Sequence, residues 1–375
     1  MSNFLQNFFK APDESVVGID VGSSSVKVVQ LRKKKGRAIL ETYGELALGP
    51  YAGFSVGQAT NLPAEKIAEA IKDVLREANV TTVSAGVSIP FKSSLVSLIE
   101  LPKVDQKQLQ EMIPMEARKY IPVPISEVTM DWWVVPGEYD DELDFVQGVD
   151  EDNNRTQPND RKVQVLVVSI HNDVLSTYSK IVQDASLSAS FFEIEMFSTT
   201  RSLLSGEVNP VLIFDMGASS TKVYILDRGV VKYSHIINKG SQEITVSISK
   251  GLNVTFDRAE HIKRNLGTSS PQEEKNVYEI ISLTLDYIFS EANTVILNYQ
   301  RRFNKPVSKV ILTGGGVAMK GVFELAKANF QTEVVMGDPF LKVEAPAFLE
   351  DVLKVTGLEF STALGLALRK LQELG

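Results

Sequence analysis

The sequence contains no cysteine. This absence excludes a disulfide framework, a thiolate metal site and a thiol nucleophile. An excess of positive charge is also missing, because the formal net charge is −8, and this disfavours nucleic acid or an anionic membrane as a partner. We see no run of about 18 apolar residues and no N-terminal stretch with the layout of a signal peptide. We therefore expect a cytoplasmic protein.

The length and composition are those of a folded protein with about two domains. The chain has 375 residues, of which 43% are hydrophobic, and a domain typically takes about 150 residues. Segments rich in Val and Ile alternate with stretches of helical periodicity, which predicts an α/β fold. We expect strands at 15–21, 26–32, 83–89, 163–170, 210–216, 221–226 and 308–313, and a first helix at 63–78.

One acidic segment, residues 137–162, has no hydrophobic periodicity. This pattern predicts an exposed loop. Its carboxylates lack the ordered spacing and the glycine of a calcium-binding loop, so we expect no metal site there.

The sequence repeats itself at the ends of two apolar strands. Asp20–Lys27 has the sequence DVGSSSVK and Asp215–Lys222 has the sequence DMGASSTK, and the same offset separates the two aspartates and the two lysines. Each copy follows one strand and precedes another, which predicts a tight hairpin. A repeated unit of this kind implies two related halves.

Such a hairpin can bind phosphate. Backbone N–H groups and serine hydroxyls of the turn can donate to phosphate oxygens, and an aspartate can hold a hydrated magnesium ion. One copy alone could be an ordinary hairpin, but two matched copies favour a polyphosphate clamp. The candidate ligands are Asp20, Gly22, Ser23, Ser24, Ser25, Lys27, Asp215, Gly217, Ala218, Ser219, Ser220 and Lys222, of which Asp20 and Asp215 would hold the metal through water.

A glycine-rich segment follows the second hairpin. In Ile311–Gly321 a strand leads into three consecutive glycines and then an amphipathic helix. The glycines leave room for a flat ligand, although such a turn is weak evidence alone. Its candidate contacts are Gly314, Gly315, Gly316 and Met319.

A helical segment, Phe256–Lys263, carries a further candidate pair. Glu260 and Lys263 lie three residues apart on one face and could reach a ribose together. The alternative is an i,i+3 ion pair on the surface.

In this order, the two hairpins, the Glu260 helix and the Thr-Gly-Gly-Gly turn resemble the actin, Hsp70 and sugar-kinase superfamily. Within it, Met115–Pro124, the Trp132–Trp133 strand and residues 163–170 resemble the PilM family of type IV pilus assembly proteins, in the FtsA-like branch. The resemblance spans Val16 to Leu371. It implies an α/β, actin-like (ribonuclease H-like) fold of two lobes, with an FtsA/PilM-type inserted subdomain in the first.

The resemblance also implies domain bounds and further site residues. Gly240 and Ser241 would lie near the phosphates, and Glu195 matches an acid that orients the attacking water in related filament proteins. From the residues alone, Glu195 could instead cap the helix that follows it. The implied domains are a first lobe at 1–208 with an insertion at about 91–190, a second lobe at 209–345 with a smaller subdomain at about 240–290, and a segment at 346–375 that returns to the first lobe.

The implied cofactors are ATP and Mg²⁺. The implied function is a cytoplasmic component of the type IV pilus or a related secretion machinery, peripheral to the inner membrane. It would bind the N-terminal tail of a PilN-like inner-membrane protein, associate with the membrane through that partner and couple nucleotide state to assembly. Pilus motor ATPases are further implied partners, and the chain could form a homo-oligomer or ring. Nucleic acid is not expected as a partner. Slow ATP hydrolysis is left open.

Two other functions of the superfamily stay open. An FtsA-like filament protein would tether to a membrane through a terminal amphipathic helix, and Phe4, Leu5, Phe8 and Phe9 are candidates for it although Pro12 follows closely. A small-molecule kinase would need a base aimed at an acceptor hydroxyl, and no motif in the sequence supplies one.

Overall fold

The computed structural model describes residues 15–135, 162–266 and 271–373, without the side chains of 271–274. Contacts divide the chain into two compact units. Unit 1 comprises Met1–Pro90 and Thr177–Gly375, and unit 2 comprises Phe91–Ser176. The expected acidic loop, apart from Lys162, and the N-terminal aromatic residues lie outside the described residues.

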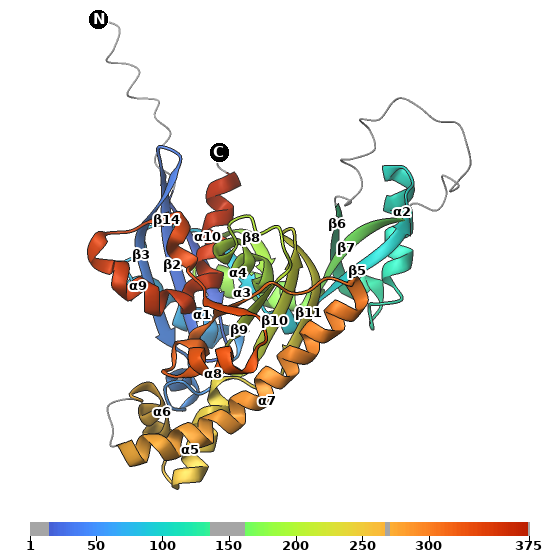
Figure 1. The fold of residues 1–375 in the computed structure, drawn as a ribbon. Coiled ribbons are helices and arrows are strands. Elements are labelled where there is room, and N and C mark those ends of the chain that lie inside the picture. The colour runs from blue at the N-terminus through green and yellow to red at the C-terminus, as the bar shows by residue number, and fades with distance from the viewer. Residues whose placement is uncertain (1–14, 136–161, 267–270, 374–375) are drawn as a thin grey trace, which may run out of the picture. The chain divides into compact units, whose positions relative to one another are not determined.

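Unit 1 contains two mixed sheets with the same plan (Figure 1). Their strand orders are β14-β3-β2-β1-β4-β8 and β11-β10-β9-β12-β13, and in each sheet an antiparallel meander is followed by two parallel pairings. The two related halves implied by the sequence repeat correspond to these sheets. The first sheet consists of β1 (Ser15–Val21), β2 (Ser25–Lys34), β3 (Arg37–Ala47), β4 (Ser84–Ile89), β8 (Ser188–Ile194) and β14 (Val343–Glu344). The second consists of β9 (Val211–Met216), β10 (Thr221–Asp227), β11 (Val230–Ile237), β12 (Lys309–Thr313) and β13 (Glu333–Met336).

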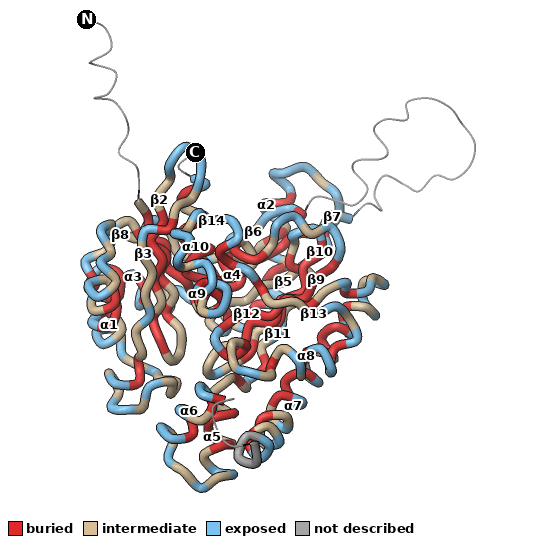
Figure 2. Tube along the Cα trace, turned by 60° about the vertical axis from the view of Figure 1, so that its left-hand side comes forward, coloured by how far each residue is buried: buried red, intermediate tan, exposed pale blue. Residues whose placement is uncertain are grey.

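Buried residues follow the strands of both sheets and the inner faces of the helices (Figure 2). The expected helix at 63–78 is confirmed as α1, and Ile71 and Val74 of its predicted apolar stripe are buried. The helices are α1 (Ala64–Glu77), α3 (Asn172–Asp184), α4 (Glu195–Leu203), α5 (Ser241–Leu252), α6 (Phe256–Arg264), α7 (Pro271–Phe303), α8 (Val322–Asn329), α9 (Glu350–Thr356) and α10 (Ser361–Glu373).

The long helix α7 is a core helix of the second sheet. Ile281, Leu285 and Phe289 pack in one cluster with Phe214 of β9. By length and composition alone, the segment Lys275–Phe303 could also cross a membrane. Polar residues interrupt its apolar ones, so this segment is consistent with the absence of a run of about 18 apolar residues.

Helix α10 packs directly on β1 and α4, and two glycines make this contact possible. A Cβ atom at Gly18 would lie 1.9 Å from the carbonyl oxygen of Ala363, and one at Gly365 would lie 1.9 Å from the carbonyl oxygen of Ser198. The C-terminal helix is therefore seated against the first sheet.

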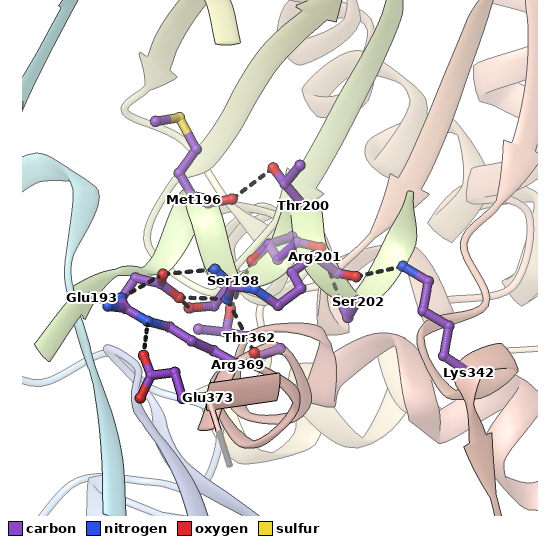
Figure 3. Close-up of polar contacts among 12 residues, drawn as sticks. Glu193, Met196, Ser198, Thr200, Arg201, Ser202, Lys342, Thr362, Arg369 and Glu373 are labelled. Carbon is purple, nitrogen blue, oxygen red and sulfur yellow. Dashed lines mark hydrogen bonds and ion pairs between the residues drawn. The ribbon is translucent and has the colours of Figure 1, made fainter. Parts of the chain in front are cut away.

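A buried ion network fixes the start of α4 to α10 (Figure 3). Glu193, at the end of β8, accepts hydrogen bonds from Arg201, from Arg369 of α10 and from Ser198. The two guanidinium groups hold the pKa of the Glu193 carboxyl below its usual value despite burial. Because Glu193 precedes Glu195 by two residues, the network also positions the candidate acid.

Unit 2 is a three-stranded sheet with a helix on one face. Its strands, in the order β5-β7-β6, are antiparallel, and the predicted strand with two tryptophans is confirmed as β6. Ile99, Ile113 and Val165 form its core with other apolar residues. The elements are β5 (Ser94–Pro102), α2 (Gln106–Ala117), β6 (Val128–Val135) and β7 (Lys162–His171).

The unit boundary differs from the end expected for the insertion. The expected insertion ran to about residue 190, whereas unit 2 ends at Ser176. The difference arises because β8 pairs in parallel with β4 of the first sheet, so the chain has already returned to unit 1. The other domain bounds stay predictions.

Candidate functional site

The repeated motifs form two hairpins with the same register. In the first hairpin Asp20 lies opposite Lys27, and in the second Asp215 lies opposite Lys222. Side chains of directly opposed residues lie on the same face of a sheet. Each hairpin therefore presents one carboxylate and one ammonium group side by side next to its turn.

The turns of the two hairpins have the same closing hydrogen bond. The N–H of Gly22 donates to the carbonyl of Ser25, and the N–H of Gly217 donates to that of Ser220, each at 3.0 Å. Among the backbone hydrogen bonds that the described residues make in turns, loops and caps, none has the N–H group of residue 23 or 24 as its donor. Such amides are suited to phosphate oxygens.

Glu195, the first residue of α4, lies beside both hairpins: Lys222 of the second pairs with it directly, and its charge acts on Asp20 of the first. Lys222 Nζ lies 2.8 Å from a Glu195 carboxylate oxygen and 3.6 Å from one of Asp215. The Asp20 carboxylate accepts a hydrogen bond from the Ser88 hydroxyl at 2.8 Å. This centre brings together Glu195 and the Asp–Lys pairs that the sequence predicted.

Burial changes the acidity of this centre. Burial, together with repulsion from Glu195, raises the pKa of Asp20 to about 6, and burial also raises the pKa of Asp215. Burial opposes the charge of Lys222, but the carboxylates of Asp215 and Glu195 raise its pKa. The centre is therefore short of positive charge.

The two aspartates fit a magnesium ion by their chemistry. Mg²⁺ takes one or two carboxylates and completes its octahedron with water and phosphate oxygens. Among the described residues, no group of three or more acidic or histidine side chains could hold a metal ion. Asp20 and Asp215 would therefore bind the ion together with water and a phosphate ligand.

The N-terminus of α5 is docked on the second turn. The N–H of Ser241 donates to the carbonyl of Gly217 at 2.9 Å, and a Cβ atom at Gly240 would lie 2.5 Å from the carbonyl oxygen of Ala218. Glycine at position 240 permits this approach. The positive end of the α5 dipole thus lies beside the predicted phosphate-binding turn.

The glycine turn also packs against the end of β9. Gly314 has a φ of +88°, and a Cβ atom there would lie 2.5 Å from a carboxylate oxygen of Asp215. A Cβ atom at Gly316 would lie 2.5 Å from the side chain of Met216. Met319 packs against the core of the second sheet. Glycine at 314 and 316 is needed for packing, besides any role in ligand binding.

Glu260 and Lys263 form a buried ion pair rather than a surface one. Their charged atoms lie 2.7 Å apart, and the Thr245 hydroxyl bridges both side chains. Burial lowers the pKa of Lys263 despite its partner. A Cβ atom at Gly57 would lie 2.7 Å from the Glu260 carboxylate, so the loop after β3 approaches this pair. Their contact with a ribose stays a prediction.

The sequence analysis missed Glu45 and Glu359. Glu45 lies opposite Lys27 in the register of β2 and β3, and its carboxylate is 3.0 Å from Lys27 Nζ. A Cβ atom at Gly315 would lie 3.3 Å from the Glu359 carboxyl carbon. The hairpin register could have indicated Glu45, but no sequence signal links Glu359 to the glycine turn.

A family model described as "Type IV pilus assembly protein PilM" matches residues 18–371. The chain belongs to this family. In a solved "PilM-PilN type IV pilus biogenesis complex", a chain with 22% identity is similar to this one with a TM-score of 0.77, and the match covers 96% of this chain and 99% of that one. The PilM resemblance and the actin-like fold expected from the sequence are thereby confirmed.

More distant relatives have the same fold. MreB 5 of Spiroplasma citri, solved with AMPPNP bound, matches with a TM-score of 0.52 at 9% identity, over 97% of this chain and 98% of that one. The cell division protein FtsA of Neisseria meningitidis serogroup B is 24% identical over an alignment 356 residues long, and the match covers 86% of this chain and 82% of FtsA. The fold is shared more widely than the sequence.

Proposed function

We propose that this PilM-family chain binds ATP and Mg²⁺ between its two hairpins and acts as a cytoplasmic component of the type IV pilus or a related secretion machinery. The observation that carries the proposal is the matched pair of hairpins. Their Asp–Lys pairs occupy equivalent register positions, and Glu195 pairs with Lys222 of the second hairpin while its charge acts on Asp20 of the first. A single polyphosphate can use both turns only in such an arrangement.

Each part of the nucleotide has candidate ligands. The amides and hydroxyls of turns 22–25 and 217–220 would bind the phosphates, with Lys27 and Lys222 as cations and the α5 N-terminus beside the second turn. The glycine turn at 314–316 and Met319 would contact the adenine, and the Glu260–Lys263 pair the ribose. When bound, magnesium would supply the positive charge that Asp20 and Asp215 require.

We infer that ATP turnover is slow. Glu195 is the candidate acid for orienting a water molecule, but its carboxylate is held by Lys222 at 2.8 Å. This ion pair keeps Glu195 occupied and its charge partly neutralised. Hydrolysis by Glu195 therefore requires Lys222 to move toward phosphate first.

Calorimetric titration with ATP and magnesium tests the site. Lys27→Met and Lys222→Met should each weaken ATP binding roughly tenfold or more, because a charge-assisted hydrogen bond contributes about 1.5–3 kcal/mol. Lys66→Met is the matched control, since Lys66 is exposed on α1 and pairs with Glu69. Equal affinity in all three variants, or no ATP binding by the wild type, would contradict the proposal.

The proposed partner is the N-terminal tail of a PilN-like inner-membrane protein, through which the chain would reach the membrane. Family membership and the solved PilM–PilN relative support it. Unit 2 exposes Met115, Tyr120 and Trp133 at 60%, 48% and 40% of their surface, and an extended peptide needs two or three such anchors. Pilus motor ATPases and ring formation stay predictions.

A tail peptide from a candidate partner tests this part separately. Tyr120→Ala and Trp133→Ala should weaken peptide binding, whereas Phe348→Ala should not, because Phe348 is an exposed residue of unit 1. We expect magnesium-ATP to change the affinity for the tail. Equal affinities for the tail with and without the nucleotide would show that the two binding events are not coupled, and the chain would then act only as a scaffold for its partner.

An FtsA-like filament protein is the second candidate, favoured by the FtsA relatives. It would bind lipid vesicles without a partner. Sedimentation of the purified chain with anionic vesicles distinguishes the two, because the proposed function predicts that the chain stays in the supernatant until the partner is added. The kinase alternative predicts phosphate transfer to an added acceptor, whereas our proposal predicts none.

A further inference from the structure

The carbonyl groups of Ser23 and Ala218, at equivalent positions of the two phosphate turns, are both held by neighbouring backbone. The N–H group of Thr60 donates to the Ser23 carbonyl at 2.8 Å, and the N–H group of Gln242, the second residue of α5, donates to the Ala218 carbonyl at 2.9 Å. In a planar trans peptide the carbonyl points away from the N–H group of the next residue. Each bond therefore turns a carbonyl away from the side on which the following amide could bind phosphate.

One hydrogen bond joins these two supports to each other. The side-chain Oε1 atom of Gln242 accepts a hydrogen bond from the N–H group of Ala59 at 2.5 Å. Because Ala59 precedes Thr60, a continuous path of bonds runs from the Ser23 carbonyl through the loop and Gln242 to the Ala218 carbonyl. The first turn lies between β1 and β2, and the second lies between β9 and β10. The path therefore connects the hairpins of the two sheets.

The loop at residues 53–63, which supplies both donors on its side of this path, also contacts α6. Its Gly57 has a φ of +86°, and a Cβ atom there would lie 2.7 Å from a carboxylate oxygen of Glu260. Phe54 and Val56 expose about half of their surface, so apolar packing of these two side chains contributes little to the placement of the loop. Its hydrogen bonds in the path are therefore important for holding it in place.

We propose that Gln242 is a positioning residue that joins the two phosphate turns, so that they bind one polyphosphate as a single site. The inference rests on the proposed ATP site and deepens it. Without the bond to Ala59, the turns must be ordered relative to each other when the ligand binds, and this ordering opposes binding. With the bond, their separation is set beforehand. Gln242 acts through the loop and the turns and does not itself need to touch the phosphates.

The coupling acts in both directions. If the bond strengthens ATP binding by a given factor, ATP stabilises the bond by the same factor, because linked binding free energies are reciprocal. The Ala59 N–H group reports on the bond directly, since a hydrogen-bonded amide exchanges with solvent only when its bond opens. Magnesium-ATP should therefore slow the exchange of this amide.

Calorimetric titration of the full chain with magnesium-ATP is the first test. Gln242→Met removes the side-chain acceptor and keeps both the length of the side chain and the backbone N–H group. We expect it to weaken ATP binding roughly three- to tenfold, as for the loss of one neutral hydrogen bond. Gln183→Met is the matched control, because Gln183 is exposed on α3, and it should bind ATP as the wild type does. An unchanged affinity in Gln242→Met would overturn the inference.

Hydrogen exchange at Ala59 distinguishes positioning from a general loss of stability. In the wild type, magnesium-ATP should slow this exchange by about the factor by which Gln242→Met lowers the affinity, and in the variant the slowing should be lost. Slowing that persists in Gln242→Met, or no slowing in the wild type, would overturn the inference while leaving ATP binding intact. No ATP binding by the wild type would instead overturn the proposed function, and this inference with it.

Discussion

The two Asp–Lys pairs are equivalent in sequence but not in surroundings. Lys27 is held by Glu45, which β3 supplies, whereas Lys222 is held by Glu195 and Asp215. The sequence repeat could predict the shared residues, since each pair depends only on its own hairpin. The repeat itself does not contain Glu45, Glu195 or Glu359: the register of β2 and β3 could have indicated Glu45, the family resemblance pointed to Glu195, and no sequence signal pointed to Glu359.

Replacing Asp20 should stabilise the fold while weakening the site. Its pKa rises from 3.8 in the unfolded chain to about 6 in the folded one, so the folded state holds the proton longer and loses stability as pH rises from about 4 to 6. At pH 7 the ionised carboxylate costs up to about 3 kcal/mol. We expect Asp20→Asn to raise the free energy of unfolding by about 1–3 kcal/mol at pH 7 and to weaken ATP binding.

Urea denaturation at about pH 7 and pH 4 measures this change. The gain should shrink at the lower pH, where Asp20 of the wild type is itself protonated. Asp351→Asn is the control, because Asp351 is fully exposed, and it should change stability by less than about 0.5 kcal/mol. A less stable Asp20→Asn protein at pH 7 would show that the carboxylate is stabilising.

The strands that could be predicted from the sequence are those that are buried on both faces. The seven expected strands are confirmed as β1, β2, β4, β7, β9, β10 and β12, and these carry the continuous Val and Ile runs typical of buried strands. The outer strands β3 and β11 are mostly half-exposed, so their polar residues hide the pattern. The β13 strand has only four residues, too few for a periodicity.

The close packing of α10 on β1 requires a residue without a side chain at position 18. A Cβ atom at Gly18 would stand 1.9 Å from the Ala363 carbonyl oxygen, so Gly18→Ala must push helix and strand apart. We expect a loss of at least about 3 kcal/mol in the free energy of unfolding, the upper end for overpacking. Urea denaturation followed by circular dichroism measures it.

Gly36→Ala is the control for this loss. Gly36 has a φ of +77° and nothing within 4 Å of a Cβ atom, so only backbone strain opposes alanine there, at about 1–2 kcal/mol. Equal losses in the two variants would contradict the packing argument.

At the scale of the whole molecule, the same strand order occurs in both sheets, and the C-terminal helix packs on the sheet that the N-terminal strands form. The orders β3-β2-β1-β4-β8 and β11-β10-β9-β12-β13 match strand for strand, and α10 closes on the first sheet. The insertion of unit 2 between β4 and β8 distinguishes the halves. The family and the actin-like fold could be inferred from motif order, whereas the end of the insertion depended on a strand pairing that local sequence does not encode.

The central claim is that one nucleotide uses both hairpins, and a crystal structure of the chain with magnesium-AMPPNP tests it most directly. Our account predicts phosphates between turns 22–25 and 217–220, a magnesium ion near Asp20 and Asp215, and the adenine at residues 314–316. A nucleotide that contacts one hairpin alone, or that lies elsewhere on the chain, would contradict it.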